Sequence, residues 1–276
     1  VTVPYGTDYQ YISVTNLGTG LLGYSAIPFG VTYTPLGNNH FKTKAELTSD
    51  AGTARARFVT IADMNNDGKP DLIVGNSNNT ISVFVNQITS TTGMAVFGLA
   101  TNFGTANGSV SASLAIGDLD GDGLLDIAAV NSGSSVVTIY HNITHVIGGT
   151  PNFAPSTSSA TPATPVAVRM ADIDGDGLLD IIVVSRLASS NVAVLRNLGN
   201  ILGTLTFASA QLYSAGVNPS SLAIGDMDQD GKVDIAVANG TSNSVSLFHN
   251  TSTAPGAITL GAPSTLTTNI NPASLV

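Results

Sequence analysis

Short apolar segments rich in Val, Ile and Ala recur along this chain, separated by stretches rich in Gly, Asn and Ser. The clearest of them are continuous apolar runs such as DIIVV at 180–184 and DIAVA at 234–238. A second apolar segment follows each such run and ends in Asn; these segments cover 81–86, 136–142, 191–197 and 245–250. Short segments of this composition bounded by turn residues predict strands, and continuous apolar runs predict strands covered on both faces.

An acidic segment repeats at a fixed interval. Its copies begin at Ala62, Gly117, Ala171 and Gly225, and their first aspartates are 55, 54 and 54 residues apart. Each repeat also holds a weaker apolar segment, such as 207–216, and a fourth one, such as 220–226, that leads into the next acidic segment. Sheets of four strands repeated at a constant period predict a β-propeller.

The two ends of the chain resemble parts of one further repeat. Residues 271–276 match 218–223, residues 1–16 resemble 235–250, and residues 41–49 fall where a fourth strand belongs. We therefore predict an all-β fold, a five-bladed β-propeller of four-stranded blades, with the ring closed by N- and C-terminal strands that share one blade. The single domain spans 1–276, with repeat units at about 55–108, 109–163, 164–217 and 218–270, and a fifth blade from 271–276 plus 1–49.

Each acidic segment places oxygen-bearing side chains at positions 1, 3, 5 and 9, and position 6 is always Gly. Alternating oxygen donors around a glycine turn are typical of Ca²⁺ loops, because Ca²⁺ takes 6–8 oxygen ligands in flexible geometry. Position 7 would contribute a backbone carbonyl. An EF-hand is excluded, because position 12 is Val or Ala and strands flank the loop. The predicted metal ligands are Asp63, Asn65, Asp67, Lys69 and Asp71; Asp118, Asp120, Asp122, Leu124 and Asp126; Asp172, Asp174, Asp176, Leu178 and Asp180; Asp226, Asp228, Asp230, Lys232 and Asp234.

The distribution of charge supports this interpretation. Only 10% of residues are charged, the net charge is −9, and fifteen of the eighteen acidic residues lie in the four segments. About four Ca²⁺ ions, one per loop, would bring the net charge to about −1. Asp-Gly turn chemistry alone is an alternative for one loop, but four copies in register favour metal. Hard oxygen ligands favour Ca²⁺ over zinc, and Mg²⁺ resists such complete dehydration.

Composition also excludes several classes of protein. The acidic balance and only nine basic residues argue against nucleic-acid binding. No apolar run approaches the roughly 18 residues of a membrane span, so we expect no membrane insertion. The sequence has no cysteine, no G-x-S-x-G motif and few carboxylates outside the loops. We therefore expect that the protein is not an enzyme. The four histidines are not spaced as a metal site, although His141 and His249 occupy the same repeat position.

The D-x-[DN]-x-D-G-x-x-D loops resemble the FG-GAP/VCBS repeat family, the integrin α-subunit-like calcium-binding β-propellers. The resemblance covers about residues 55–250 and implies Ca²⁺ between the first and second strands of each blade, on one face. It also implies a secreted or cell-surface protein. Members serve as adhesion heads, as lectins and as non-catalytic parts of larger proteins. Six or seven blades are commoner in the family than five, and the literal FG-GAP signature is weak here.

The expected fifth blade is the unusual one. It lacks an acidic loop, carries an insertion at 17–40 and holds five of the seven tyrosines: Tyr5, Tyr9, Tyr11, Tyr24 and Tyr33. Tyrosine packs on sugars and on protein partners, but it also fills cores. The loops at 75–80, 131–135, 185–191 and 239–244 are small and polar, and they suit hydroxyl groups or plain solvent. We predict a calcium-stabilised extracellular binding module that recognises carbohydrate, as a lectin does. The alternative is an integrin-like, protein-binding cell adhesion module or a non-catalytic domain of a larger surface protein.

Overall fold

The computed structural model describes residues 13–15, 22–24, 47, 55–89, 96–104, 111–187 and 191–275. The chain divides into two compact units, Val1–Leu47 with Val276, and Thr48–Leu275. In the first unit, β1 (Ser13–Thr15) and β2 (Leu22–Tyr24) form an antiparallel pair. The described residues are all-β: they contain no helix, and hence no helix able to cross a membrane.

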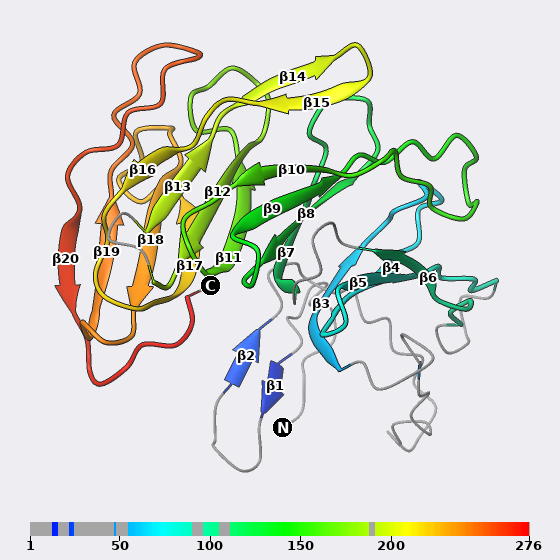
Figure 1. The fold of residues 1–276 in the computed structure, drawn as a ribbon, viewed down its shortest axis with the longest axis horizontal. Helices are drawn as coiled ribbons and strands as arrows, with labels where there is room; N and C mark the ends of the chain where they lie inside the picture. The colour runs from blue at the N-terminus through cyan, green and yellow to red at the C-terminus, as the bar shows by residue number, and fades with distance from the viewer. Residues whose placement is uncertain are drawn as a thin grey trace, which may run out of the picture. The chain divides into compact units, whose positions relative to one another are not determined.

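The second unit holds four antiparallel sheets of four strands each, and Figure 1 shows them in sequence. In each sheet consecutive strands are neighbours, except that the third sheet contains an inserted hairpin, β14–β15 (Asn197–Ile201 and Thr204–Phe207). The strands are β3 (Ala56–Ala62), β4 (Asp71–Asn76), β5 (Thr80–Phe84) and β6 (Thr101–Gly104); β7 (Ser111–Gly117), β8 (Asp126–Asn131), β9 (Val136–Tyr140) and β10 (Thr157–Ala160); β11 (Pro165–Ala171), β12 (Asp180–Ser185), β13 (Val192–Leu195) and β16 (Gln211–Tyr213); β17 (Pro219–Gly225), β18 (Asp234–Asn239), β19 (Ser244–Phe248) and β20 (Ser264–Thr267).

The predicted repeat is confirmed by this arrangement. Each expected strand of the repeats at 55–270 has a counterpart, and the first strands β3, β7, β11 and β17 of successive sheets pack side by side. Every first strand also carries a register shift near its start, between Ala56 and Phe58 in β3 and at the same point in the others. Four-stranded sheets that adjoin through their first strands are the blades of a propeller.

The hydrophobic cores lie between neighbouring sheets, because each sheet is apolar on both faces. Strands β8, β12 and β18 are buried along their whole length. In β12, Ile181 and Val183 belong to the core shared with β8 and β9, whereas Ile182 and Val184 belong to the core shared with β17 and β18. Alternate residues of a strand face opposite sides. The continuous apolar runs therefore predicted correctly that these strands are covered on both faces.

The expected fifth blade falls mainly on residues outside those that the structure describes, so the count of five blades and the closure of the ring stay predictions. Residues 271–275, expected as its first strand, form no strand. They do lie beside β17: the backbone N–H of Leu275 donates to Ser221 Oγ (3.1 Å), and Ser220 Oγ donates to the carbonyl of Pro272 (2.8 Å).

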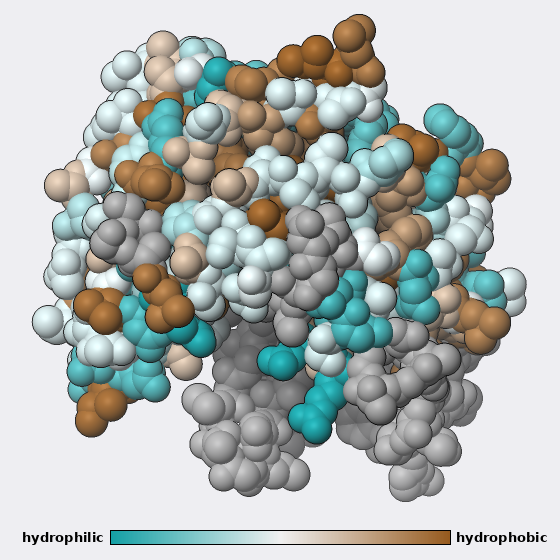
Figure 2. All heavy atoms as spheres, viewed as in Figure 1, coloured by the Kyte–Doolittle hydropathy of each residue, from teal (hydrophilic) through white to brown (hydrophobic). Residues whose placement is uncertain are grey.

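The β14–β15 hairpin was not predicted, because its Gly- and Asn-containing sequence indicates a loop. Its tip exposes apolar side chains: Ile201 is 52% exposed and Leu202 is fully exposed. Figure 2 shows this tip as a brown projection at the top of the molecule. The corresponding connection of the second sheet exposes Val146 and Ile147 as well. These tips belong to the segments that join the third and fourth strands.

Candidate metal centres

Four acidic loops join the first strand of each sheet to the second. We call them loop 1 (63–71), loop 2 (118–126), loop 3 (172–180) and loop 4 (226–234). In every sheet the last residue of the first strand pairs with the aspartate at position 9, as Gly117 pairs with Asp126. The position-9 aspartates are therefore the first residues of the buried second strands, and the side chains of Asp71, Asp126 and Asp180 are fully buried.

The aspartate at position 1 closes the turn. In loop 3, Asp172 Oδ1 accepts the backbone N–H of Gly175 (2.7 Å), and Oδ2 accepts that of Gly177 (2.9 Å). Gly177, at position 6, has φ +90°, and no atom lies within 4 Å of where its Cβ would be. The need for glycine is therefore conformational, since this backbone region costs other residues about 1–2 kcal/mol. The same bond from position 6 recurs in the other loops, at 2.7 Å to Asp63, 2.9 Å to Asp118 and 2.9 Å to Asp226.

The aspartate at position 9 links the loop to the end of the third strand. In loop 2, Asp126 Oδ2 accepts the backbone N–H of Leu119 (2.8 Å), and Oδ1 accepts that of Asn142 (2.7 Å). The same two bonds recur in the other three loops at 2.8–3.0 Å. Both oxygens of this carboxylate thus have a fixed orientation before any ion is considered.

In the second, third and fourth sheets, the asparagine that follows the third strand connects neighbouring sheets. Asn142 Nδ2 donates to the carbonyl of Leu125 in its own sheet (3.0 Å) and to that of Met64 in the preceding sheet (2.9 Å). Asn197 and Asn250 make the equivalent bonds to the preceding sheet, at 2.7 Å and 2.8 Å. All three side chains are fully buried. The sequence shows these asparagines as a repeat, but their partners lie 77 or 78 residues away, so sequence reasoning missed their role.

The side chain at position 3 also meets the next sheet. Asn65 Nδ2 donates to the carbonyl of Gly149 (3.0 Å), and Asp120 Oδ2 accepts the amide of Asn200 (2.7 Å). Asp174 Oδ2 accepts the backbone N–H of Gly256 (3.0 Å). Each of these three loops is therefore covered by the segment between the third and fourth strands of the following sheet.

Burial controls the electrostatics of the loops. Desolvation raises the pKa of Asp126 to about 6 and that of Asp180 to about 7, although each carboxylate accepts two backbone N–H bonds. Burial also raises the pKa of Asp71 and Asp174. Among the described residues, no neighbouring positive charge is strong enough to hold the pKa of these carboxyl groups at the usual value of an aspartate.

The loop residues fit a divalent cation that prefers oxygen. Carboxylate oxygens lie within 4.8 Å of one another in three sets: Asp118, Asp120 and Asp126; Asp172, Asp174 and Asp180; Asp226, Asp228 and Asp230. In loop 1, Asn65 stands at position 3 and is fully buried, and its Oδ1 has no hydrogen-bond partner. A bound ion would give this oxygen a partner and would offset the desolvation of the buried carboxylates. The donor set is the one that Ca²⁺ prefers.

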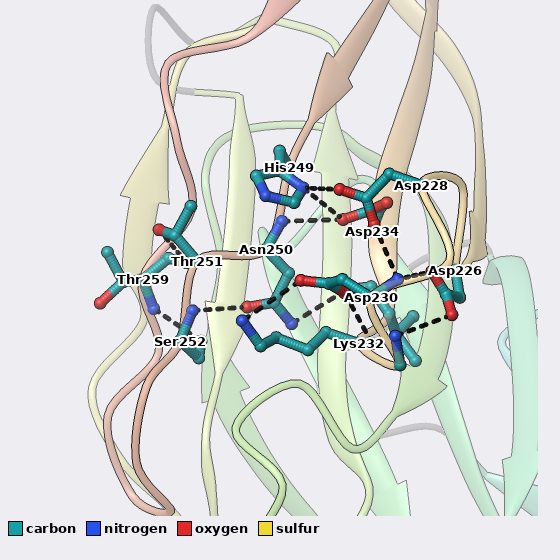
Figure 3. A network of polar contacts seen from close by, with 12 residues as sticks. Asp226, Asp228, Asp230, Lys232, Asp234, His249, Asn250, Thr251, Ser252 and Thr259 are labelled. Carbon is teal, nitrogen blue, oxygen red and sulfur yellow. Dashed lines mark hydrogen bonds and ion pairs between the residues drawn. The ribbon is translucent and has the colours of Figure 1, made fainter.

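At position 7, where a backbone carbonyl is the predicted ligand, the structure records hydrogen bonds of the N–H group, and the role of the carbonyl stays a prediction. The N–H of Lys69, Leu124, Leu178 or Lys232 donates to the position-5 carboxylate of its own loop at 2.8–2.9 Å. In loop 4 the ammonium group of Lys232 also approaches Asp230 Oδ2 (3.2 Å), and Figure 3 shows this contact beside the turn. These bonds hold one face of the position-5 carboxylate.

Two histidines lie against these loops, contrary to the expectation from their spacing. His141 Nε2 is 2.9 Å from Asp120 Oδ2 in loop 2. His249 Nδ1 is 3.0 Å from Asp228 Oδ2 and 3.4 Å from Asp234 Oδ1 in loop 4, and Figure 3 shows the imidazole facing both carboxylates. Each histidine directly precedes the asparagine that follows the third strand. The acidic loop that it contacts joins the first and second strands of the same sheet. The shared repeat position is the sequence signal from which this placement could have been found.

The other predicted ligand-binding residues are less informative. Tyr5, Tyr9, Tyr11 and Tyr33 lie outside the described residues, and Tyr24 is the last residue of β2.

The polar loops at the other end of the sheets are short connections, and each of three sheets has a buried asparagine bonded to the third strand there. Asn76 donates to Ser82 Oγ, Asn131 to Thr138 Oγ1 and Asn239 to Ser246 Oγ, at 2.8–2.9 Å.

A groove of about 620 Å³ lies at the outer edge of the second and third sheets. Its lining includes Ser159 and Ala160 of β10, Thr161, and Phe207 and Ser209 near β15. Hydroxyl groups beside one aromatic ring give it both hydrogen-bonding and stacking capacity. Nothing in the sequence indicated it, because its two walls come from different repeats.

Comparison with known proteins agrees with the repeat and the loops. The model of the FG-GAP-like repeat matches residues 63–129, 118–183 and 176–237, and that of the FG-GAP repeat matches 218–260. Two solved structures are similar at low identity. They are "BBS1N in complex with ARL6DN, soaked with lead" (14% identity, TM-score 0.45, 95% of this chain and 71% of that chain) and the V. cholerae biofilm matrix protein Bap1 (18%, 0.34, 69% and 37%). No match to a curated protein sequence was found.

Together the family matches cover residues 63–260 and include all four loops. Repeats of this kind are often calcium-binding and are typical of extracellular, adhesion-like β-propeller modules. The described structure agrees in its four-stranded antiparallel sheets and in the acidic clusters at their strand connections. The chain belongs to the FG-GAP repeat family.

Proposed function

We propose that this chain is a calcium-stabilised extracellular binding module that recognises carbohydrate and has no catalytic activity of its own. One observation carries the calcium part of this proposal. The four loops share the same hydrogen bonds, three of them gather carboxylate oxygens within 4.8 Å of one another, and two contain a buried carboxylate, Asp126 or Asp180, whose pKa burial raises to about 6 or 7. A bound Ca²⁺ would supply the positive charge that keeps these carboxylates ionised.

The loops also explain why calcium would act on stability. In loop 2, Asp126 accepts the N–H of Asn142, and Asn142 in turn donates to Met64 in the preceding sheet. Fixing the carboxylate therefore fixes the junction between two sheets. A ligand that binds only the folded state stabilises it by about 2.7 kcal/mol per site at a concentration one hundred times its Kd.

The calcium proposal is tested by thermal melting with and without EDTA. We expect EDTA to lower the melting temperature markedly and Ca²⁺ to restore it, whereas Mg²⁺ should restore less. Asp122→Asn, in an exposed part of loop 2, should reduce the number of bound Ca²⁺ ions measured by calorimetry without unfolding the chain. An unchanged melt in EDTA, together with no Ca²⁺ uptake, would refute the proposal.

For the carbohydrate we propose the groove between the second and third sheets as the site, alongside the tyrosines expected in the fifth blade. Ser159, Thr161 and Ser209 offer hydroxyl groups there, and Phe207 offers an aromatic ring. The test is a glycan array with the calcium-loaded chain. Ala160→Arg would obstruct the groove, and Thr267→Arg is the matched control at the equivalent position of β20. Array binding that Ala160→Arg does not weaken would exclude the groove.

The exposed apolar tips favour a second candidate function, protein binding as in cell adhesion. Ile147 is 76% exposed and Leu202 fully exposed, and both lie on segments that join third and fourth strands. Contiguous patches of exposed apolar side chains are typical of protein contact sites. A blank glycan array, with capture of a protein partner that Leu202→Ser abolishes, would favour adhesion over carbohydrate recognition.

We also propose that the fifth blade completes the ring. The contacts of Pro272 and Leu275 with β17 support this, because the first strand of a fifth blade would lie beside β17. Removing residues 271–276 should then lower the melting temperature. A truncated chain that melts at the same temperature as the full chain would contradict closure by this segment.

A further inference from the structure

One residue position of the repeat distinguishes the four loops from one another. The residue just before the strand-ending asparagine is Val85 in the first sheet, His141 in the second, Arg196 in the third and His249 in the fourth. In the second, third and fourth sheets this side chain lies beside the acidic loop of its own sheet. Two of the four loops therefore have an imidazole as a neighbour, and two do not.

In loop 2 the two imidazole nitrogens are shielded from solvent and have no hydrogen-bond partner. The side chain of His141 is 12% exposed, and both of its ring nitrogens are shielded from solvent. Nε2 lies 2.9 Å from Asp120 Oδ2, but the arrangement does not have hydrogen-bond geometry, and Nδ1 has no partner either. Buried polar groups are nearly always satisfied, so an unsatisfied imidazole beside carboxylates indicates a ligand that supplies the missing bond.

Three candidate ligand atoms of loop 2 lie close together. One oxygen from Asp120, one from Asp122 and one ring nitrogen of His141 all lie within 4.8 Å of one another. Asp120 is held by Asn200 of the next sheet (2.7 Å), and Asp122 is held by the N–H of Leu124 (2.8 Å). Both carboxylates thus have fixed positions. Asp120 Oδ1 also accepts the N–H of Asp122 (3.4 Å), so a metal ion would share the Asp120 oxygens with these hydrogen bonds.

Loop 4 repeats the arrangement with a different pair of carboxylates. His249 Nδ1, Asp228 Oδ2 and Asp234 Oδ1 face one another, with the nitrogen 3.0 Å and 3.4 Å from the two oxygens (Figure 3). Around an ion with metal–ligand bonds of about 2.1 Å, two ligand atoms in tetrahedral positions are about 3.4 Å apart. The separations in loop 4 are close to this value.

We propose that loops 2 and 4 bind a divalent transition-metal ion of the zinc class through one imidazole and two carboxylates, and that loops 1 and 3 do not. The physical reason is the nitrogen donor. Imidazole suits Zn²⁺, Cu²⁺ and Ni²⁺, whereas Ca²⁺ takes oxygen ligands. Three protein ligands leave at least one position for water, as zinc sites other than closed structural ones do. The assignment does not require that calcium stabilises the fold.

The other two loops serve as controls within the same chain. Val85 in the first sheet has no donor atom. In the third sheet the guanidinium of Arg196 approaches Asp176 Oδ2 (Nη1 to Oδ2, 3.9 Å). Arginine stays protonated and cannot ligate a metal, so it disfavours a second cation at this point. If carboxylates alone bound the ion, all four loops would behave alike.

The experiment is a titration of the metal-free full chain with Zn²⁺ by calorimetry and with Co²⁺ by visible absorption, where nitrogen ligation changes the spectrum. We expect two equivalents of the ion at histidine-containing sites. His141→Ala and His249→Ala should each remove one equivalent, and the double variant should remove both. His145→Ala is the matched control, because His145 is exposed and should leave both equivalents in place.

His141→Arg is a second variant, since it introduces the residue that the third sheet already has at this position; it should also remove one equivalent. Should a variant fail to fold, NMR of the imidazole nitrogens in the unaltered chain gives the answer directly: Zn²⁺ should shift the signals of His141 and His249 and leave those of His145. Zn²⁺ uptake that is unchanged in the double variant, or imidazole signals that do not respond, would overturn the proposal.

The same variants separate this inference from the calcium proposal. A double variant that loses Zn²⁺ but is still stabilised by Ca²⁺ would support both. A chain that binds two Zn²⁺ ions through histidine but melts identically in EDTA and in Ca²⁺ would uphold the inference and refute calcium stabilisation. The converse result, calcium stabilisation without histidine-dependent Zn²⁺ binding, would overturn the inference alone.

Discussion

Replacing Asn142 with alanine is expected to weaken the junction between the first and second sheets. The amide nitrogen of Asn142 donates to the carbonyls of Met64 and Leu125 at 2.9 and 3.0 Å, and its Oδ1 accepts the N–H of Thr144 at 3.0 Å. The side chain is fully buried. Alanine keeps none of these bonds and leaves three backbone groups without their partner.

The magnitude follows from those three groups. A buried polar group that loses its partner costs about 1–3 kcal/mol. Water entering the space left by the amide would recover part of that loss. We therefore expect Asn142→Ala to lower the free energy of unfolding by about 3–5 kcal/mol, against a typical total of about 5–15 kcal/mol for a domain. Asn197→Ala and Asn250→Ala should have a similar effect, because they break the same set of bonds.

The assay is urea unfolding of the full chain in saturating Ca²⁺, followed by circular dichroism. Asn86→Ala is an informative partner: Asn86 bonds to Pro70 and Ile88 of its own sheet, and among the described residues it makes no bond to another sheet. Asn86→Ala should lower the free energy of unfolding by about 1 kcal/mol less than Asn142→Ala does, because it breaks one fewer bond to a backbone group and about 1 kcal/mol is the net value of one hydrogen bond. Exposed Asn152→Ala should change stability by less than about 0.5 kcal/mol. A loss below about 1 kcal/mol for Asn142→Ala would refute the reasoning.

Two further predictions concern the loops themselves. The pKa values of Asp126 and Asp180 are raised by burial from 3.8 to about 6 and about 7, so the metal-free fold favours their protonated forms. Asp126 and Asp180 therefore contribute about 3 and about 4 kcal/mol, respectively, to the free energy of unfolding. This contribution is present below pH 4 and is lost as the pH rises through 6 to 7. As the pH is lowered from 8 to 5, the melting temperature should therefore rise in EDTA. In Ca²⁺ it should fall over the same range, because protons displace the ion. A melting temperature that falls in EDTA as the pH is lowered would contradict this. Gly177→Ala should cost about 1–2 kcal/mol through its φ of +90°, whereas Gly225→Ala, which lacks a positive φ and also has open space around its Cβ position, should cost less, as thermal melting would show.

The elements that could be predicted from sequence are those whose cause is local. The second strands have continuous apolar runs, the loops have oxygen donors at fixed spacing, and the glycine at position 6 has a conformation that its neighbours impose. A constant period then extends one local pattern to four sheets. The β14–β15 hairpin could not be found in this way, because the sequence around Gly199 and Gly203 indicates a turn without showing that two paired strands flank it.

The features that were missed depend on contacts between repeats or between the strands of one repeat. Asn142 reaches a carbonyl 78 residues away, and the groove near Ser159 has walls from two sheets. The histidines were judged by their spacing along the chain, where His141 and His249 lie far apart. The residues that surround each histidine depend instead on strand pairing. In each sheet the third strand pairs with the second, so the end of the third strand lies beside the acidic loop that precedes the second strand.

The repeat fixes the backbone of each loop and leaves one side chain free to vary beside it. Asp at position 1, glycine at position 6 and Asp at position 9 make the same hydrogen bonds in each copy, so the four turns share one geometry. The residue before the strand-ending asparagine does not contribute to those bonds, and it changes from Val85 to His141 to Arg196 to His249. Because a metal loop is selective through its donor atoms rather than its backbone, substitution at this one position would be sufficient, under our proposal, to give neighbouring loops different preferences for ions.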